Sequence, residues 1–186
     1  AGVNSIVVLG VDFMSENVRA VLDAAGLHNV PVYRVVTREI GCSLADAAEA
    51  TAYGAWLDKA QKSHNPLHVI YINTRLQVKA KSHAKVPTIT CTSSNVVQTL
   101  LQAAAQIPDL SLWYGPDTYM GQNLERLFLN LLDGSDEQIA TLHPSHNRAT
   151  VLQMLDRFSY FKQGNCVVHH MFGEEVVKQV KRDHTD

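Results

Sequence analysis

Apolar runs and amphipathic stretches alternate along the chain. Apolar runs stand at 5–10, 67–72, 88–91, 110–114 and 158–161, and each is followed by a polar turn and a stretch with helical periodicity. Continuous apolar strands that alternate with amphipathic helices are typical of parallel sheets covered by helices on both faces. The pattern therefore predicts an α/β protein built from three-layer αβα units with parallel sheets.

Turn and capping residues mark the predicted helix ends. Ser15 precedes a helix that we expect to begin at Glu16, and Gly26 fits the end of this helix. Three side chains can cap the helical stretch that begins at Val96: Thr92, Ser93 and Ser94. The segment 133–157 has a weaker pattern, which predicts a surface insertion with a short helix.

The sequence KSHNP at 62–66 breaks the helix that follows Cys42. We predict a division at this break, because linkers between compact units contain such turn-forming residues. Residues 1–65 form a partial αβ unit that carries Cys42. Residues 66–186 form a complete αβα unit that carries Cys166.

Composition excludes several classes of partner. The 186 residues are 46% hydrophobic and 18% charged, as in ordinary folded domains. The net charge of −2 and the lack of a long basic run argue against a nucleic-acid partner. No apolar run approaches the roughly 18 residues that a membrane-spanning helix needs. We expect neither nucleic acid nor a membrane as a partner.

The three cysteines are Cys42, Cys91 and Cys166, and they form no CxxC pair. Their odd number argues against a disulfide framework, and their spacing argues against a zinc finger or ribbon. A generic metal-binding or redox domain is therefore the least favoured class. Cysteines this far apart in the sequence can still meet in space.

Polar or sulfur-containing residues follow several of the predicted strands. They are Asp12, Met14, Tyr71, Asn73, Ser93, Ser94, Asp117 and Cys166. Ligands of open parallel sheets bind outside the carboxyl ends of the strands, where helix N-termini offer free N–H groups to anions. This placement predicts a small, oxygen-rich ligand that is anionic or phosphorylated. Turn chemistry alone also enriches such residues at strand ends.

Four stretches together resemble quinolinate synthase, in an order and at separations that make the match specific. They are GVDFMSENV at 10–18, GCSLAD at 41–46, YINT with TCTSSN within 71–95, and GPDTYMG with GNCVVH within 115–169. The resemblance covers essentially the whole chain. It is closest to the plant and algal form, through TITCTSSNVVQTLLQA and the HHMFG ending.

The resemblance implies an enzyme of NAD biosynthesis that condenses iminoaspartate with dihydroxyacetone phosphate to quinolinate. It also implies pseudo-threefold architecture and a [4Fe–4S] cluster held by three cysteines, one from each αβα unit. The fourth iron stays open as a Lewis acid for dehydration. Cys42 and Cys166 match two of the cluster ligands. The resemblance gives Cys91 no ligand role, and a buried packing residue is its plainer interpretation.

The resemblance also supplies candidate site residues. Tyr71 and Asn73 match a catalytic, substrate-binding pair, since a phenol and an amide bind carboxylate or carbonyl oxygens without a competing charge. Ser93, Met14 and His169 match residues that bind substrate or border the site. Each has a structural alternative: a core-edge Tyr, a turn Asn, an N-cap Ser, a packing Met and a partly buried His.

No function transfers to His170, which stands where bacterial relatives carry an acidic residue. Asp117 in GPDTYMG has Thr118 beside it instead of the Lys of bacterial relatives, so a loop-shaping role for Asp117 is the plainer interpretation.

The chain lacks counterparts of the family's opening segment and of its third unit, which carries the third cluster cysteine. We therefore expect a fragment that is inactive alone. The alternative is a non-catalytic αβ module that binds a small molecule and has lost the cluster. The plant-like motifs imply the plastid stroma, or the cytoplasm if the source is neither plant nor alga. The resemblance also implies a monomer or homodimer.

Overall fold

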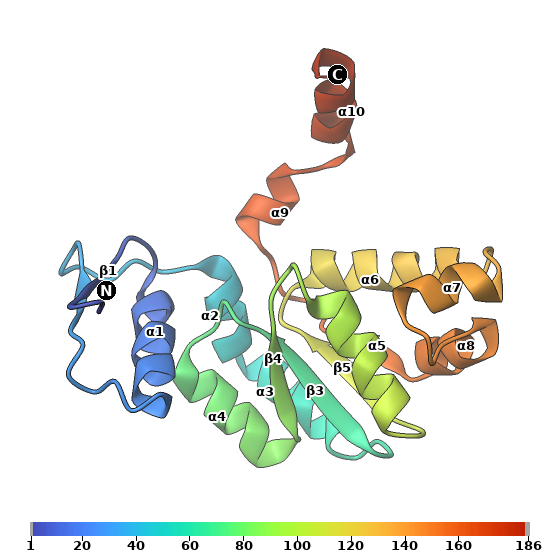
Figure 1. Ribbon diagram of the computed structural model, residues 1–186, viewed down its shortest axis with the longest axis horizontal. Coiled ribbons are helices and arrows are strands. Elements are labelled where there is room, and N and C mark those ends of the chain that lie inside the picture. Colours follow the sequence, from blue (N-terminus) through green and yellow to red (C-terminus); the bar gives the residue numbers. More distant parts are fainter. Residues whose placement is uncertain (1, 185–186) are drawn as a thin grey trace.

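The structure is a computed structural model and describes residues 2–184. Its N-terminal part comprises strand β1 (Ile6–Val8), helix α1 (Asp12–Ala24), strand β2 (Val32–Arg34), helix α2 (Ser43–Glu49) and helix α3 (Thr51–Ala60). β1 and β2 form a parallel two-stranded sheet. This small sheet and α1 lie at one end of the molecule (Figure 1).

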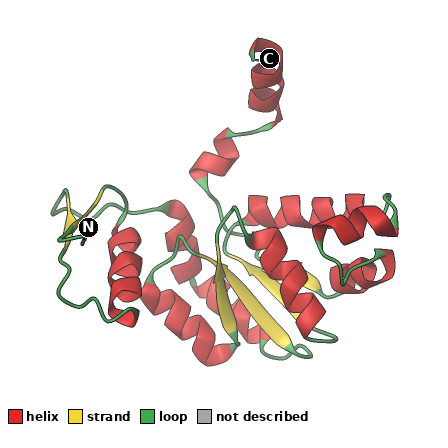
Figure 2. Cartoon of the chain, viewed as in Figure 1, coloured by secondary structure: helices red, strands yellow, loops and turns green. Residues whose placement is uncertain are grey.

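A four-stranded parallel sheet forms the centre of the molecule (Figure 2). In the order of the sheet, its strands are β4 (Thr88–Cys91), β3 (Pro66–Tyr71), β5 (Ser111–Gly115) and β6 (Phe158–Tyr160). The helices between them are α4 (Leu76–Lys85), α5 (Val96–Gln106), α6 (Thr118–Leu131), α7 (Asp136–Leu142) and α8 (Arg148–Asp156). Because all four strands are parallel, their carboxyl ends share one edge. The predicted α/β class with layered helices and parallel sheets is confirmed.

The two faces of the central sheet are covered by different helices. On one face, Ile70 of β3 packs in an apolar cluster with residues of α3 and α4. On the other face, Val69 and Tyr114 belong to a larger cluster formed with α5, α6 and α8. We call this larger cluster the main core. Its buried Leu and Phe side chains hold these three helices on that face of the sheet.

A buried polar chain crosses the first of these faces. The Tyr53 hydroxyl donates to His68 Nε2 (2.7 Å), and His68 Nδ1 donates to Thr88 Oγ1 (3.2 Å). The Thr88 hydroxyl donates in turn to the Val86 carbonyl (2.7 Å), which fixes the direction of every bond in the chain. Burial lowers the pKa of His68 to about 3, so the ring is neutral at pH 7.

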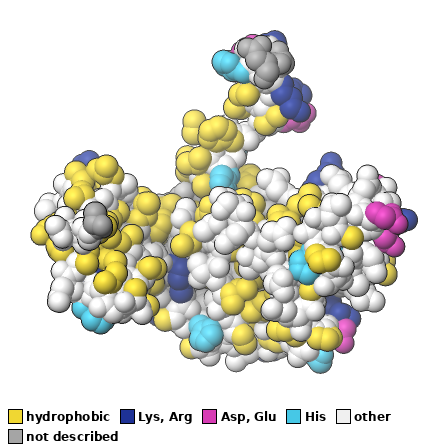
Figure 3. Space-filling view, in the orientation of Figure 1, with side chains coloured by type: hydrophobic (Ala, Val, Ile, Leu, Met, Phe, Trp, Pro, Cys, Tyr) yellow, Lys and Arg dark blue, Asp and Glu magenta, His cyan; other side chains and the backbone are white. Residues whose placement is uncertain are grey.

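The C-terminal arm consists of α9 (Val167–Met171) and α10 (Glu174–Asp183), and it projects from the body (Figure 1). Neither helix has a buried residue. Apolar side chains gather on this arm and around β1 and β2 (Figure 3). None of the described helices is both long enough and apolar enough to cross a membrane.

One predicted helix start and one predicted set of N-caps are wrong, whereas α5 begins at Val96 as predicted. α1 begins at Asp12 and not after Ser15, because the Ser15 hydroxyl donates back to the Asp12 carbonyl (2.8 Å) inside the first turn. The N-cap of α5 is Asn95, and none of the three predicted side chains caps this helix. Gly26 does follow the end of α1, with a φ of 74° that favours glycine.

The segment 133–157 is also more regular than predicted. It contains two helices, α7 and α8, each with a capping box at its start. Ile139, Val151 and Met154 from these helices are buried in the main core, so the segment completes the core and is not a surface insertion. α3 packs on the four-stranded sheet although it precedes residue 65. The division at 65 stays a prediction.

Candidate active site

The segments with Cys42 and Cys166 both meet the main core. Each cysteine is the N-cap residue of a helix, Cys42 of α2 and Cys166 of α9. Both are half-buried free thiols, and both pack against the main core. Two thiols that are far apart in the sequence thus pack against the same core, which includes Tyr71 and Cys91 at the carboxyl ends of β3 and β4.

Tyr71 and Cys91 are partners on the neighbouring strands β3 and β4. Both are buried in the main core at the last position of their strands. Burial raises the pKa of the Cys91 thiol to about 12, so this thiol stays protonated at neutral pH. Cys91 therefore has the environment of a buried packing residue, in agreement with the interpretation made from the sequence.

Asn73 lies in a loop that is held from both sides. The buried Thr74 hydroxyl donates to the Tyr71 carbonyl (3.0 Å), and Lys79 Nζ donates to the carbonyls of Ile72 (2.8 Å) and Thr74 (2.5 Å). Burial lowers the pKa of Lys79 to about 8. Lys79 also donates to Asn17 of α1 (3.0 Å), so one ammonium group connects α1 with the loop that carries Asn73.

Ser93 and Met14 lie on other, exposed segments and do not belong to the main core. Ser93 is exposed in the loop before α5, and its hydroxyl makes no hydrogen bond within residues 2–184. Met14 is 42% exposed on α1 and belongs to neither apolar cluster. Hollows of about 470 Å³ beside Trp56 and Trp113, and of about 440 Å³ between α3 and α4, contain none of the predicted site residues.

The loop before α6 and the loop before α9 are joined by hydrogen bonds. Thr118 donates its backbone N–H to the Gly164 carbonyl (3.1 Å), and its hydroxyl donates to the Phe161 carbonyl (3.0 Å). The Gly164 N–H donates to the same hydroxyl (3.0 Å). A Cβ on Gly164 would lie 1.6 Å from the Pro116 carbonyl oxygen, so only glycine permits this approach.

His169 is half-buried in α9 and contacts the Asp117 carboxylate. Asp117 is fully buried, and it is the N-cap of α6, where its Oδ1 accepts from the backbone N–H groups of Tyr119 and Met120. The N-cap agrees with a loop-shaping role, but the second carboxylate oxygen reaches the histidine. That second contact was not predicted, because 52 residues separate the two side chains.

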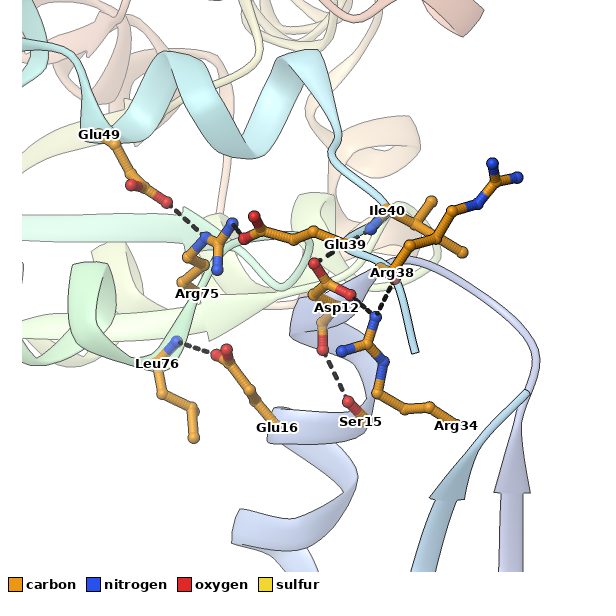
Figure 4. Close-up of polar contacts among 10 residues, drawn as sticks. All are labelled: Asp12, Ser15, Glu16, Arg34, Arg38, Glu39, Ile40, Glu49, Arg75 and Leu76. Atoms are coloured by element: carbon orange, nitrogen blue, oxygen red, sulfur yellow. Dashed lines mark hydrogen bonds and ion pairs between the residues drawn. The ribbon is translucent and has the colours of Figure 1, made fainter. Parts of the chain in front are cut away.

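A polar network connects α1 and the loop before Cys42 (Figure 4). The nearly buried Asp12 carboxylate forms an ion pair with Arg34, and it accepts the Ile40 N–H (3.2 Å). Arg34 also donates to the Arg38 carbonyl (3.0 Å). Asp12, which was predicted only as a strand-end polar residue, therefore fixes the course of the chain two residues before Cys42.

Figure 4 also shows how α1 and the segment around Cys42 are attached to the central sheet. Arg75, just after the YINT motif, forms ion pairs with Glu39 (2.8 Å) and Glu49 (2.7 Å). These glutamates precede and follow Cys42. Glu16 of α1 accepts the Leu76 N–H (3.3 Å) at the start of α4. The network thus holds the cysteine segment against the loop that carries Asn73.

Tyr114 is a further buried polar group that sequence reasoning missed. It lies in the main core, and its hydroxyl has no hydrogen-bond partner among the described residues. Burial raises the pKa of this phenol, so it is a donor at neutral pH. A buried hydroxyl without a partner costs free energy of folding, and any hydrogen-bond acceptor that reached this hydroxyl would recover that cost.

The donor set fits part of an iron–sulfur site. Within residues 2–184, no three His, Cys, Asp or Glu side chains gather in an arrangement that could hold a metal ion. Two half-buried free thiols on one core, Cys42 and Cys166, have the chemistry of cluster ligands. Among the described residues, these two thiols are therefore the side chains whose chemistry fits ligation of a cluster.

The fold defines a class of protein: a parallel α/β chain with two half-buried free thiols packed against the core of its central sheet. The family model "Quinolinate synthetase A protein" matches residues 2–186, and the chain belongs to this family. Over all 186 residues, the chain is 58% identical to the chloroplastic quinolinate synthase of Oryza sativa subsp. japonica and 56% identical to that of Arabidopsis thaliana. It spans 26% of the length of each.

Bacterial relatives are more distant. The quinolinate synthase of Nostoc punctiforme is 28% identical over 183 residues, which are 97% of this chain and 42% of the relative. No solved structure shows significant similarity to the chain. The predicted resemblance to the plant form is confirmed. The names of the plant relatives place them in the chloroplast, in agreement with the plastid location expected from the plant-like motifs.

Proposed function

We propose that this chain is part of a quinolinate synthase that condenses iminoaspartate with dihydroxyacetone phosphate, in de novo NAD biosynthesis. Quinolinate, phosphate and water are the products. The observation that supports the proposal is that Cys42 and Cys166, from two family motifs, both pack against the core that also contains Tyr71. An αβ module that only binds a small molecule has no need of two half-buried thiols on one core.

Cys42 and Cys166 would hold two irons of a [4Fe–4S] cluster. The third thiolate would then come from outside these 186 residues, because Cys91 is buried in the main core and the resemblance gives it no ligand role. When bound, the cluster supplies an open iron that acts as a Lewis acid in dehydration. Pseudo-threefold architecture, with units at 1–65 and 66–186, would place one ligand on each unit.

The chain's own residues would bind and orient the substrate. Tyr71 and Asn73 are neutral hydrogen-bonding groups, suited to carboxylate and carbonyl oxygens. Ser93, before the N-terminus of α5, would bind phosphate together with free N–H groups. His169 would border the site from α9, and Met14 would line it from α1. Lys79 and Arg75 would hold the loop of Asn73 in place.

The test is a set of three matched alanine variants in the protein that contains this chain. After anaerobic reconstitution, Cys42→Ala and Cys166→Ala should lose the [4Fe–4S] absorption and quinolinate formation, whereas Cys91→Ala should keep both. Iron and sulfide analysis separates this function from the alternatives. Retained iron and sulfide in Cys42→Ala and Cys166→Ala would refute the ligand assignment. Substrate binding without iron in the wild type would favour the binding module.

The remaining proposals concern assembly and location. We infer a protein of the plastid stroma that is a monomer or a homodimer, with small anionic substrates as its partners. Sedimentation of the reconstituted protein measures the oligomeric state directly.

A further inference from the structure

The N-terminal end of α6 holds the first turns of α9 through two separate side-chain contacts. Asp117 contacts His169, and the Tyr119 hydroxyl is 2.7 Å from His170 Nδ1. The Tyr119 and His170 rings also pack against each other, inclined by 44° with their centroids 5.8 Å apart. Both contacts act on the helix that begins directly after Cys166.

The Asp117 carboxylate determines where the His169 proton lies. Its Oδ1 already accepts two backbone N–H groups, from Tyr119 (3.0 Å) and Met120 (3.3 Å), so the carboxylate cannot turn away without uncapping α6. An ionised carboxylate is only an acceptor. His169 Nδ1, which faces Oδ2, must therefore carry a proton and donate it.

The other ring nitrogen stays available. His169 Nε2 makes no hydrogen bond within residues 2–184, and 31% of the side chain is exposed. A neutral ring with its proton on Nδ1 presents the Nε2 lone pair. The ring is held by Asp117, so Nε2 can accept a hydrogen bond without any movement of the ring.

We propose that Asp117 is a positioning residue that fixes His169 in the Nδ1–H tautomer, with the Nε2 lone pair free to accept a hydrogen bond from a hydroxyl group of the substrate. That the hydroxyl belongs to a sugar phosphate substrate rests on the proposed function. The tautomer itself rests only on the geometry of Asp117 and His169. Nothing in the family resemblance assigned this role to Asp117.

The decisive variant is Asp117→Asn, because the helix cap fixes the orientation of the new amide. Asn is as good an N-cap as Asp, so its Oδ1 should keep the two backbone bonds. Its Nδ2 group then faces His169 and is a donor only. The Nδ1–H tautomer would place two donors against each other, so the ring should change to the Nε2–H tautomer.

The tautomer can be read directly by long-range ¹H–¹⁵N correlation spectra of protein labelled with ¹⁵N at histidine. The chain has nine histidines, and His169→Gln identifies the resonances of interest by their loss. In the wild type, His169 should show a protonated Nδ1 and an unprotonated Nε2. In Asp117→Asn this pattern should be inverted.

Two further variants serve as controls. Tyr119→Phe removes only the hydroxyl that contacts His170, so it should change the His170 resonances and leave the His169 tautomer as it is. Asp117→Ser keeps a capping oxygen but removes the acceptor from the ring, so His169 should lose its fixed tautomer. If Asp117→Asn does not fold, the wild type and Asp117→Ser still decide the question.

The activity measurement is separate from the tautomer measurement. With a reconstituted enzyme, Asp117→Asn should lower kcat/KM about 10- to 100-fold, the usual effect of losing such a supporting partner, while Tyr119→Phe stays near wild type. A wild-type His169 in the Nε2–H form, or an unchanged tautomer in Asp117→Asn, would overturn the proposal. A wild type with the expected tautomer but no quinolinate formation would overturn the proposed function alone.

Discussion

The buried chain through His68 makes the stability of the fold depend on pH in a predictable direction. The folded ring accepts the Tyr53 hydroxyl at Nε2 and donates at Nδ1, so both nitrogens are used by the neutral form. Its pKa is about 3 in the folded state, against an ordinary value of 6.5. The unfolded chain therefore binds a proton below pH 6.5 that the folded protein does not take up until about pH 3.

The size of the effect follows from this difference. Stability from His68 is complete above pH 6.5 and falls as the pH decreases toward 3. At pH 5, protonation of the unfolded histidine costs the folded state about 2 kcal/mol, and the full loss below pH 3 is about 5 kcal/mol, at roughly 1.36 kcal/mol per pKa unit. Even the first figure is a large part of a typical domain stability of about 5–15 kcal/mol.

Urea unfolding at pH 7 and at pH 5 measures this contribution, with the wild type compared with His68→Asn. The asparagine cannot titrate, so the wild type should lose about 2 kcal/mol more than the variant between the two pH values. The matched control is His64→Gln, because His64 is exposed and its ring makes no hydrogen bond within residues 2–184. Equal losses in wild type and His68→Asn would refute the assignment of the effect to His68.

Three further predictions concern packing, thiol reactivity and the polar network. Gly164→Ala should destabilise the protein by about 3 kcal/mol or more in urea unfolding, because the new methyl group collides with the Pro116 carbonyl, whereas Gly54→Ala in an open part of α3 should not destabilise it. Cys91 should be alkylated last by iodoacetamide at pH 8, as mass spectrometry of peptides would show, and simultaneous labelling of all three cysteines would contradict its burial. Arg75→Gln should cost about 1 kcal/mol, with a smaller difference in high salt, and a salt-independent loss would exclude its two ion pairs as the cause.

The central sheet could be predicted from the sequence because its strands are buried on both faces. The apolar runs that become β3 and β5 have the continuous pattern of such strands. β2 was not predicted, because it is three residues long and mostly exposed, so its sequence VYR has no distinctive pattern. The start of α1 was misplaced because the Ser15 hydroxyl bonds within the helix, and capping residues also do this.

The site could be predicted only where a motif marks it. Cys42, Cys166 and Tyr71 were identified through the family resemblance, and the fold brings them to one core. Lys79 was missed because its role depends on α1, 62 residues earlier in the chain, and no local pattern records that contact. The unpartnered hydroxyl of Tyr114 was missed for a related reason: an aromatic residue in an apolar strand indicates only packing.

The Thr118 hydroxyl has a consequence for motion in this part of the fold. It is bonded to both the Phe161 carbonyl and the Gly164 N–H, so the end of β6 and the start of α6 share one side chain. Neither loop can open without breaking bonds of the other, which makes them one cooperative unit of local unfolding. In hydrogen exchange, the amides of Thr118 and Gly164 would become exposed in the same opening event. Cys166, two residues after Gly164, would be freed by the same opening event.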